Sequence, residues 1–133
     1  MSVVVGYVPD NSGLLAVRLA AQEATWRDTD VVVVNVVGAA GYTHPTAADE
    51  KVLDALDAEL EELGVRHEIR TIEETSGARP AEVLLGAAEQ SGAELIVVGL
   101  KRTSAVAKAV LGSTAQRVLL GARCPVLTVR AAD

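Results

Sequence analysis

The chain has 133 residues, of which 50% are hydrophobic and only three are aromatic (Tyr7, Trp26 and Tyr42). Its formal net charge of −6 at pH 7 argues against general nucleic-acid binding, which needs a basic surface. The single cysteine, Cys124, excludes an internal disulfide and any metal site built from several cysteines.

The first apolar run, residues 3–5, is too short for a signal peptide and lacks a basic flank. No apolar run approaches the roughly 20 residues that a membrane span requires. We therefore expect a cytoplasmic protein without membrane or nucleic-acid partners. Its length suits a single domain over residues 1–133, with a core of valine, leucine, isoleucine and alanine.

Residues 3–8 predict a first strand, and the Pro-Asp-Asn-Ser-Gly sequence of residues 9–13 predicts a turn. Asn11 or Ser12 is suited to capping the helix that follows, which extends to about Arg27. Apolar residues recur in this helix at helical spacing. The apolar positions are Leu15, Leu19, Ala20 and Trp26.

Residues 31–37 predict a second strand, and their nearly continuous valines are typical of a strand covered on both faces. Residues 38–48 contain Gly, Pro and Thr and predict a loop. A second helix over residues 49–63 follows, and Gly64 is suited to ending it. The apolar stripe of this helix consists of Val52, Leu53, Leu56, Leu60 and Leu63.

Residues 65–72 alternate apolar and charged side chains, which predicts an edge strand with one solvated face. His67 lies on this strand, and we interpret it as a structural residue. Pro80 is suited to the first turn of a third helix and Gly92 to its end. The apolar residues 95–98 then predict a buried fourth strand.

Residues 113–120 predict a fourth helix ended by Gly121, and residues 125–130 predict a fifth strand. Regular alternation of strands and helices indicates an α/β fold, with a parallel sheet, helices on both faces and right-handed crossovers. Such sheets bind ligands outside the carboxyl ends of the strands, where the strand order reverses. The candidate ligand loops are residues 9–13, 38–48 and 99–112.

The stretch from Gly99 to Thr114 contains the parts of a phosphate site. It follows a buried strand, carries the cations Lys101 and Lys108, and ends at a predicted helix start. Backbone N–H groups at a helix start are unpaired, and the helix dipole favours anions there. Residues 95–133 carry six basic residues and only one acidic residue, whereas residues 1–94 carry six basic and 17 acidic residues. The basic third of the chain therefore favours an anionic ligand near this loop.

The glycine spacing, the fourth strand and the closing residues 123–130 together resemble the universal stress protein family over essentially the whole chain. The nucleotide motif of that family is Gly-x-x-Gly, then nine residues, then Gly-Ser or Gly-Thr. Gly99 matches the first glycine, and Gly112-Ser113 match the last pair with the nine-residue gap intact. The resemblance implies a Rossmann-like sheet of strand order 3-2-1-4-5. It also implies binding of ATP or another adenine nucleotide, with or without Mg²⁺.

The resemblance assigns this nucleotide to the loops after the first and fourth strands. The implied binding residues are Pro9, Asp10, Gly99, Lys101, Arg102, Gly112, Ser113 and Thr114. Two positions depart from the family pattern: Arg102 replaces the second glycine, and Val8 aligns with the aspartate that contacts adenosine. Arginine takes positive φ only at a cost, but its guanidinium can bind phosphate in a bidentate manner. Arg102 therefore either replaces backbone contacts by side-chain contacts or marks a lost site.

The resemblance further implies a homodimer through the last strand, where Val126, Leu127 and Val129 supply an apolar edge. Two functions remain open. One is a stress-response module that binds an adenine nucleotide, and the other is a dimeric interaction module of the same family that needs no nucleotide. No general base, metal cluster or catalytic triad is evident, so we predict no catalytic residue and at most a slow ATP hydrolysis.

Overall fold

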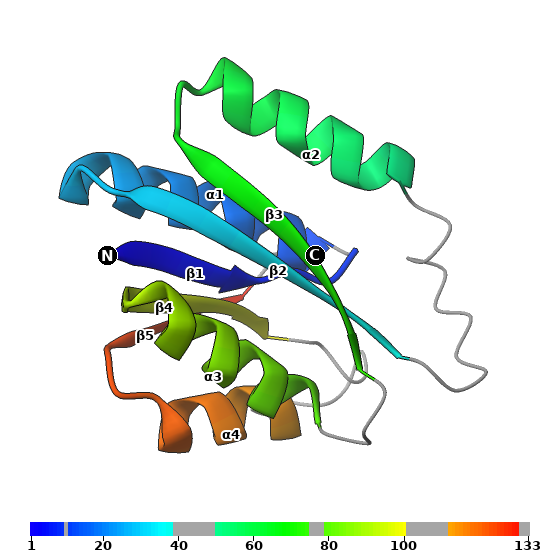
Figure 1. The fold of residues 1–133 in the computed structure, drawn as a ribbon, viewed down its shortest axis with the longest axis vertical. Helices are drawn as coiled ribbons and strands as arrows, with labels where there is room; N and C mark the ends of the chain where they lie inside the picture. Colours follow the sequence, from blue (N-terminus) through cyan, green and yellow to red (C-terminus); the bar gives the residue numbers. More distant parts are fainter. Residues whose placement is uncertain (10, 39–49, 75–78, 101–111, 131–133) are drawn as a thin grey trace.

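The computed structural model describes residues 1–133 except 10, 39–49, 75–78, 101–111 and 131–133. Its strands form one parallel sheet of five strands in the order β3-β2-β1-β4-β5, which confirms the predicted fold (Figure 1). The strands are β1 (Ser2–Gly6), β2 (Asp30–Gly38), β3 (His67–Glu74), β4 (Ala93–Leu100) and β5 (Val126–Arg130). The helices are α1 (Asn11–Arg27), α2 (Glu50–Glu62), α3 (Pro80–Ser91) and α4 (Ser113–Gly121). Most of the predicted 38–48 loop lies outside the described residues.

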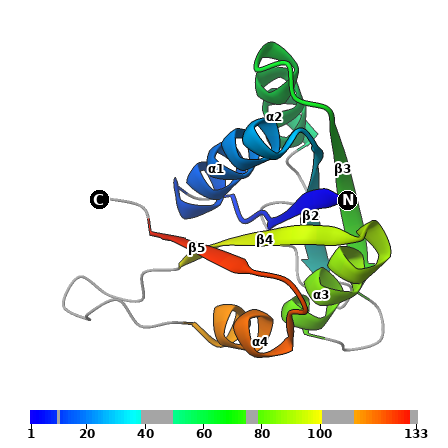
Figure 2. The same cartoon turned by 90° about the vertical axis from the view of Figure 1, so that its left-hand side faces the viewer.

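Two apolar layers pack against the two faces of this sheet (Figure 2). Because side chains alternate along a strand, Val3 and Val5 join the layer beneath α1 and α2, whereas Val4 joins the layer beneath α3 and α4. All residues from Val31 to Val34 in β2 are buried, as the run of valines predicts for a strand covered on both faces.

Helix α1 lies against the centre of the sheet through small side chains. Its buried residues are Ser12, Gly13, Ala16, Val17, Ala20, Ala21 and Ala24. Of the apolar residues predicted at helical spacing, Leu15 and Trp26 lie outside this buried face, since both are exposed and Trp26 is 69% exposed. Small residues occupy the buried face because they let the helix backbone approach the strands closely. The capping prediction is wrong, since Asn11 and Ser12 both lie inside the first turn of the helix.

Element boundaries differ from the predictions by one or two residues. Strand β1 ends at Gly6, two residues early, and β3 starts at His67, two residues late. The predicted helix ends are confirmed at Gly64 and Gly92, which have φ of 71° and 61°. Strand β3 lies at one edge of the sheet, as its alternating pattern predicts.

The sheet topology brings the ends of β1 and β4 together. These strands pair directly, with Gly6 opposite Val98, and the helices that follow them, α1 and α4, lie on opposite faces of the sheet. This is the point where the strand order reverses, and therefore the place where an open α/β sheet binds a ligand. Within the described residues, none of the helices combines the length and apolar character that a membrane crossing needs.

Candidate functional site

Close backbone packing fixes the turn between β1 and α1. A Cβ atom added to Gly13 would lie 1.7 Å from the carbonyl oxygen of Val8, so only glycine fits there. Before the turn, the buried Tyr7 donates its backbone N–H to the carbonyl oxygen of Val34, 2.9 Å away. Val8 and Pro9 then emerge at the carboxyl edge of the sheet, where both are exposed.

The end of β4 packs against the start of α1. A Cβ atom at Gly99 would lie 2.8 Å from the carbonyl oxygen of Ser12 and 2.9 Å from its hydroxyl oxygen. Glycine is therefore required at residue 99 by protein packing, whether or not a ligand binds. The glycine spacing correctly identifies Gly99 as a position that needs glycine. It does not predict the contact with Ser12, because that contact joins two segments far apart in the chain.

Among the described residues, no side chain caps the start of helix α4. Its N-cap residue is Gly112, which makes no side-chain capping hydrogen bond. The N–H of Gln116 donates to the carbonyl oxygen of Gly112 over 3.0 Å, which closes the first helical turn. The side chains of Ser113 and Thr114 are exposed to solvent. This geometry leaves the first turn of α4 open to an anion.

Gly112 differs from Gly99 in its surroundings. A Cβ atom added to Gly112 would meet no heavy atom of the described residues within 4 Å, and its φ of −64° is accessible to any residue. Neither packing nor backbone conformation within the described part of the chain explains a glycine there. A glycine in open space at a helix start permits close approach of a ligand to the backbone.

Five of the eight predicted binding residues can be placed in the fold. Pro9 follows β1, Gly99 lies near the end of β4, and Gly112, Ser113 and Thr114 start α4. Parallel topology brings all three segments to the carboxyl edge of the sheet. Asp10, Lys101 and Arg102 lie outside the described residues. In the described part of the chain, no group of three or more histidines, cysteines or acidic residues is placed to hold a metal ion.

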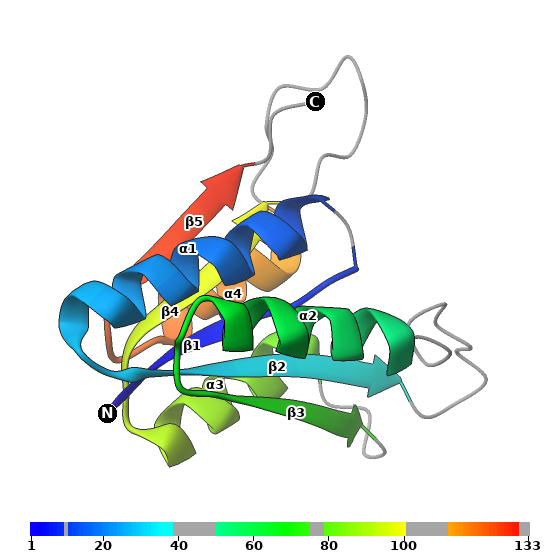
Figure 3. The ribbon, with the colours of Figure 1, turned by 90° about the horizontal axis from the view of Figure 1, so that it is seen from above.

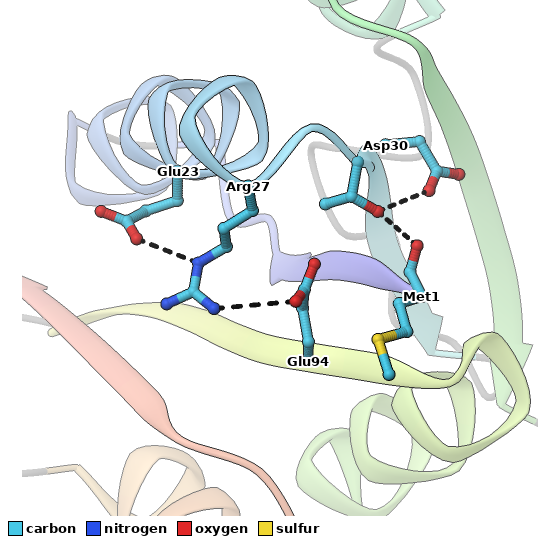
Figure 4. Close-up of polar contacts among 6 residues, drawn as sticks. Met1, Glu23, Arg27, Asp30 and Glu94 are labelled. Carbon is cyan, nitrogen blue, oxygen red and sulfur yellow. Dashed lines mark hydrogen bonds and ion pairs between the residues drawn. The ribbon is translucent and has the colours of Figure 1, made fainter.

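The opposite, amino edge of the sheet carries a polar network that the sequence patterns did not reveal (Figure 4). The Arg27 guanidinium lies 3.3 Å from a Glu23 carboxylate oxygen and 3.8 Å from a Glu94 carboxylate oxygen. The Thr29 hydroxyl donates to the carbonyl oxygen of Met1. These contacts border an open hollow of about 640 Å³, in which acidic and basic side chains are mixed. Opposite charges at short range neutralise one another, so this edge has no charge preference for a ligand.

His67 lies beside that hollow at the start of β3. Its Nε2 is 2.6 Å from a carboxylate oxygen of Asp57, and its Nδ1 is 2.7 Å from the carbonyl oxygen of Val65. Burial alone would lower the pKa of His67, but the Val65 carbonyl and the carboxylates of Asp57 and Glu61 outweigh burial and raise it. The histidine therefore ties α2 to β3, in agreement with its predicted structural role.

Cys124 is half-buried against the apolar layer beneath α3 and α4, and burial raises the pKa of its thiol. A thiol with a raised pKa forms little of the reactive thiolate. Cys124 is therefore placed as a small apolar residue rather than as a nucleophile.

Comparison with known proteins yields consistent matches. The model of the universal stress protein family matches residues 1–130. A universal stress protein of Mycolicibacterium smegmatis is 38% identical over 128 residues, which are 96% of each chain. A universal stress protein of Archaeoglobus fulgidus, solved in complex with dAMP, has a TM-score of 0.74 and 25% identity, covering 96% of both chains. A universal stress protein solved with cAMP has a TM-score of 0.76 and 26% identity, covering 99% of this chain and 98% of the other.

Proposed function

This chain belongs to the universal stress protein family, and on that premise we propose that it binds an adenine nucleotide at the carboxyl edge of its sheet. The proposed site lies between the loops that follow β1 and β4. ATP is the proposed ligand, with or without Mg²⁺, and nucleotide occupancy would serve as a signal in a cytoplasmic stress response. The functional unit is a single domain over residues 1–133.

The start of α4 is the observation that carries this proposal. Among the described residues, no atom lies within 4 Å of a Cβ added to Gly112 and no side chain caps the helix, and Ser113 and Thr114 are exposed. A phosphate at this position would accept hydrogen bonds from the free N–H groups of the first turn and would be attracted by the helix dipole. The nearby loop supplies Lys101, Arg102 and Lys108 as cations in sequence.

The related structures support the same chemical class of ligand. The dAMP of the Archaeoglobus fulgidus protein and the cAMP of the second relative share an adenine base and a phosphate. For this chain, the phosphate would bind at α4, and the base and sugar would lie toward the turn after β1. Pro9 and Asp10 are the proposed contacts in that turn.

Titration calorimetry with ATP tests the proposal. We expect saturable binding to the wild type and its loss in Gly112→Val, because the branched side chain would occupy the space proposed for phosphate. Gly86→Val is the matched control, since Gly86 in α3 also has no heavy atom within 4 Å of an added Cβ. Absence of heat and of thermal stabilisation at millimolar ATP, or equal loss in both variants, would contradict a nucleotide site at α4.

A second titration tests the role of Arg102. If its guanidinium contacts phosphate, Arg102→Ala should weaken binding of ATP more than binding of adenosine, which has no phosphate. Equal weakening of both ligands would remove Arg102 from the phosphate site.

Val8 supports the alternative function, an interaction module without a nucleotide. Val8 is 47% exposed two residues after the end of β1, where the family resemblance predicts an aspartate that contacts adenosine. A valine cannot accept the hydrogen bonds that a carboxylate accepts. Val8→Asp distinguishes the two functions: improved ATP binding supports an active nucleotide site, whereas no binding by either protein supports the interaction module.

We also propose a homodimer through β5. This strand forms an edge of the sheet, and Val126 and Leu127 are only partly buried. Val129 packs into the core, and Leu127 and Val126 pack against the two apolar layers, so β5 would contribute mainly its backbone to a partner. Edge strands without charges invite pairing, and β5 has no charged residue before Arg130. Sedimentation of wild type and Thr128→Lys tests this interface, since Thr128 is only partly buried and a lysine on an edge strand opposes pairing.

A further inference from the structure

Asn35 is a buried polar residue whose side-chain amide has no hydrogen-bond partner among the described residues. Within that part of the chain, the buried polar residues are Ser2, Ser12 and Asn35. The Ser2 hydroxyl donates to the carbonyl oxygen of Ser91 over 3.3 Å, and Ser12 also has an interaction partner. Asn35 is only 3% exposed, yet its amide is unpartnered. Such an amide is costly, because it loses hydrogen bonds to water and gains none from the protein.

The sheet register places Asn35 beside the proposed nucleotide site. Strand β2 lies between β1 and β3, and α1 and α2 cover one face of these strands (Figure 3). Val31 and Val33 belong to the apolar layer beneath those helices, so the alternation of side chains directs Asn35 to the same face. The last residue of β1, Gly6, pairs with Val34. Asn35 is therefore the first residue of β2 beyond the end of β1, at the level where the turn toward α1 begins.

Two other polar side chains flank Asn35 on the neighbouring chain segments. Tyr7 follows β1, donates its backbone N–H to the carbonyl oxygen of Val34, and belongs to the apolar layer beneath α1 and α2. Thr71 pairs with Asn35 in β3 and is exposed. Ile69 packs against the same apolar layer, so alternation directs Thr71 to that face as well. The row of these three side chains therefore runs from a buried aromatic ring to a threonine in contact with solvent.

The Asn35 amide is accessible to a ligand. Among the described residues, Ser91 Oγ is the fully covered polar side-chain atom that lacks a hydrogen-bond partner. The amide of Asn35 lacks a partner too but is not fully covered, so part of it stays in contact with solvent. Val8, next to Tyr7, and Thr71 are both exposed. A flat group that enters from the carboxyl edge can therefore reach the amide without opening the core.

The chemistry of this amide matches the amino-bearing edge of adenine. The carbonyl oxygen of an asparagine side chain accepts hydrogen bonds, and its NH₂ group donates them. Adenine carries its 6-amino group, a donor, next to a ring nitrogen that accepts. Both hydrogen bonds can form at once, and the base would satisfy an amide that the described part of the fold leaves unpartnered.

Given the proposed nucleotide site, on which this role depends, we infer that Asn35 selects the adenine base through its 6-amino group. The Asn35 carbonyl oxygen accepts a hydrogen bond from that amino group, and the Asn35 NH₂ group donates one to the adjacent ring nitrogen. Stability alone would favour an apolar residue at this position of β2, whose neighbours along the strand are valines. Base selection accounts for a buried amide there.

Titration calorimetry with two nucleotides tests this role. ATP is compared with purine riboside triphosphate, which is ATP without its 6-amino group. We expect the wild type to bind ATP about tenfold more tightly, as for the loss of one hydrogen-bonded contact. In Asn35→Leu, the Kd for ATP should rise at least about tenfold and equal the Kd for the second nucleotide. The urea midpoint of Asn35→Leu should be kept or raised, because an unpartnered amide is removed. Asn35→Ala should give the same equal Kd values without introducing a larger side chain.

Ser2→Ala is the matched control, because Ser2 is also buried but lies at the amino end of β1 and has its own partner. It should lower the urea midpoint and leave the preference for ATP unchanged. Equal Kd values for the two nucleotides in the wild type, or a preference for ATP that persists in Asn35→Leu and Asn35→Ala, would overturn the role of Asn35 while the nucleotide site stands. A wild type that binds neither nucleotide would overturn both. A lower urea midpoint in Asn35→Leu with an unchanged preference would instead assign the amide to an ordered water.

Discussion

At the carboxyl ends of the strands, chain segments meet through backbone atoms, whereas at the amino ends they meet through charged side chains. Gly13 approaches the carbonyl oxygen of Val8, and Gly99 approaches Ser12, with no room for a Cβ atom at either position. At the amino ends, Arg27 contacts Glu23 and Glu94 at the surface.

These two kinds of contact differ in strength and in how much movement they allow. Backbone packing leaves little freedom for movement, so it can hold the end of β4 and the turn after β1 in a fixed relation. Exposed ion pairs are weakened by water and salt and cost side-chain entropy. The carboxyl edge should therefore be the rigid end of the sheet, where the chain is most sensitive to substitution.

The largest effect is expected for Gly13→Ala. Its Cβ would overlap the carbonyl oxygen of Val8 at 1.7 Å, so the β1–α1 turn must move. We expect a loss of about 3 kcal/mol in the free energy of unfolding, measured by urea denaturation. Gly86→Ala is the control, because it meets no neighbouring atom and should stabilise α3 by about 0.5 kcal/mol. Equal stability of the two variants would mean that the turn between β1 and α1 is not tightly packed around Gly13.

Gly99→Ala should have the next largest effect. Its Cβ would lie 2.8 Å from the Ser12 carbonyl oxygen, which is a smaller overlap than at Gly13. A shift of the end of β4 can relieve this overlap, so we expect a loss of about 2 kcal/mol in the free energy of unfolding. Hydrogen exchange should become faster in β4 and in the first turn of α1, and remain unchanged in α2. Protection that falls evenly over the whole chain would show that Gly99 has no local role.

The sequence predicted the elements well because their signals are local. The valine run of β2 and the glycines at positions 64 and 92 each specify a structure within a few residues. The exposure of Trp26 was not predicted, because helical periodicity shows only which apolar residues share a face of the helix. It does not show that α1 packs against the sheet through its alanines. The contact between Gly99 and Ser12 depends on how β4 and α1 pack together, which no local pattern contains.

The candidate site was predictable to a similar extent. The spacing from Gly99 to Gly112 identifies the family, and the fold brings the carboxyl ends of β1 and β4 to the same edge of the sheet, as expected. The spacing cannot distinguish Gly99 from Gly112, although packing requires a glycine at residue 99, whereas a Cβ added to Gly112 would meet no atom of the described residues within 4 Å. It also could not indicate the contact between Arg27 and Glu94 at the amino edge, since these two residues come from different elements, α1 and β4.

The pH dependence of stability should reveal the contact between His67 and Asp57. Because the pKa of His67 is raised in the folded chain, the folded state binds the proton more tightly than the unfolded state. The resulting stabilisation is complete below the ordinary histidine pKa of 6.5 and is lost as the pH rises through the raised value. Urea midpoints of wild type and His67→Gln, measured from about pH 6 to about pH 9, should converge toward the alkaline end.

Two variants identify the source of that pH dependence. Asp57→Asn should reduce it, because the carboxylate that stabilises the charged imidazole is removed. His44→Gln is the control and should leave it unchanged, since the described contacts of His67 are with Asp57 and Val65. A stability difference between wild type and His67→Gln that stays constant with pH would show that the histidine acts by packing alone.

The smallest effect is expected for Arg27→Ala at the amino edge. Arg27 contacts Glu23 one helical turn earlier and Glu94 at the start of β4, and all three side chains are partly solvated. Its charge also lies in the last turn of α1, where the helix dipole favours a cation. Partly solvated pairs of this kind contribute little, so we expect a loss of about 0.5 kcal/mol in the free energy of unfolding, decreasing at high salt. A loss as large as that of Gly99→Ala, or one that salt does not reduce, would mean that the amino edge is as rigidly packed as the carboxyl edge.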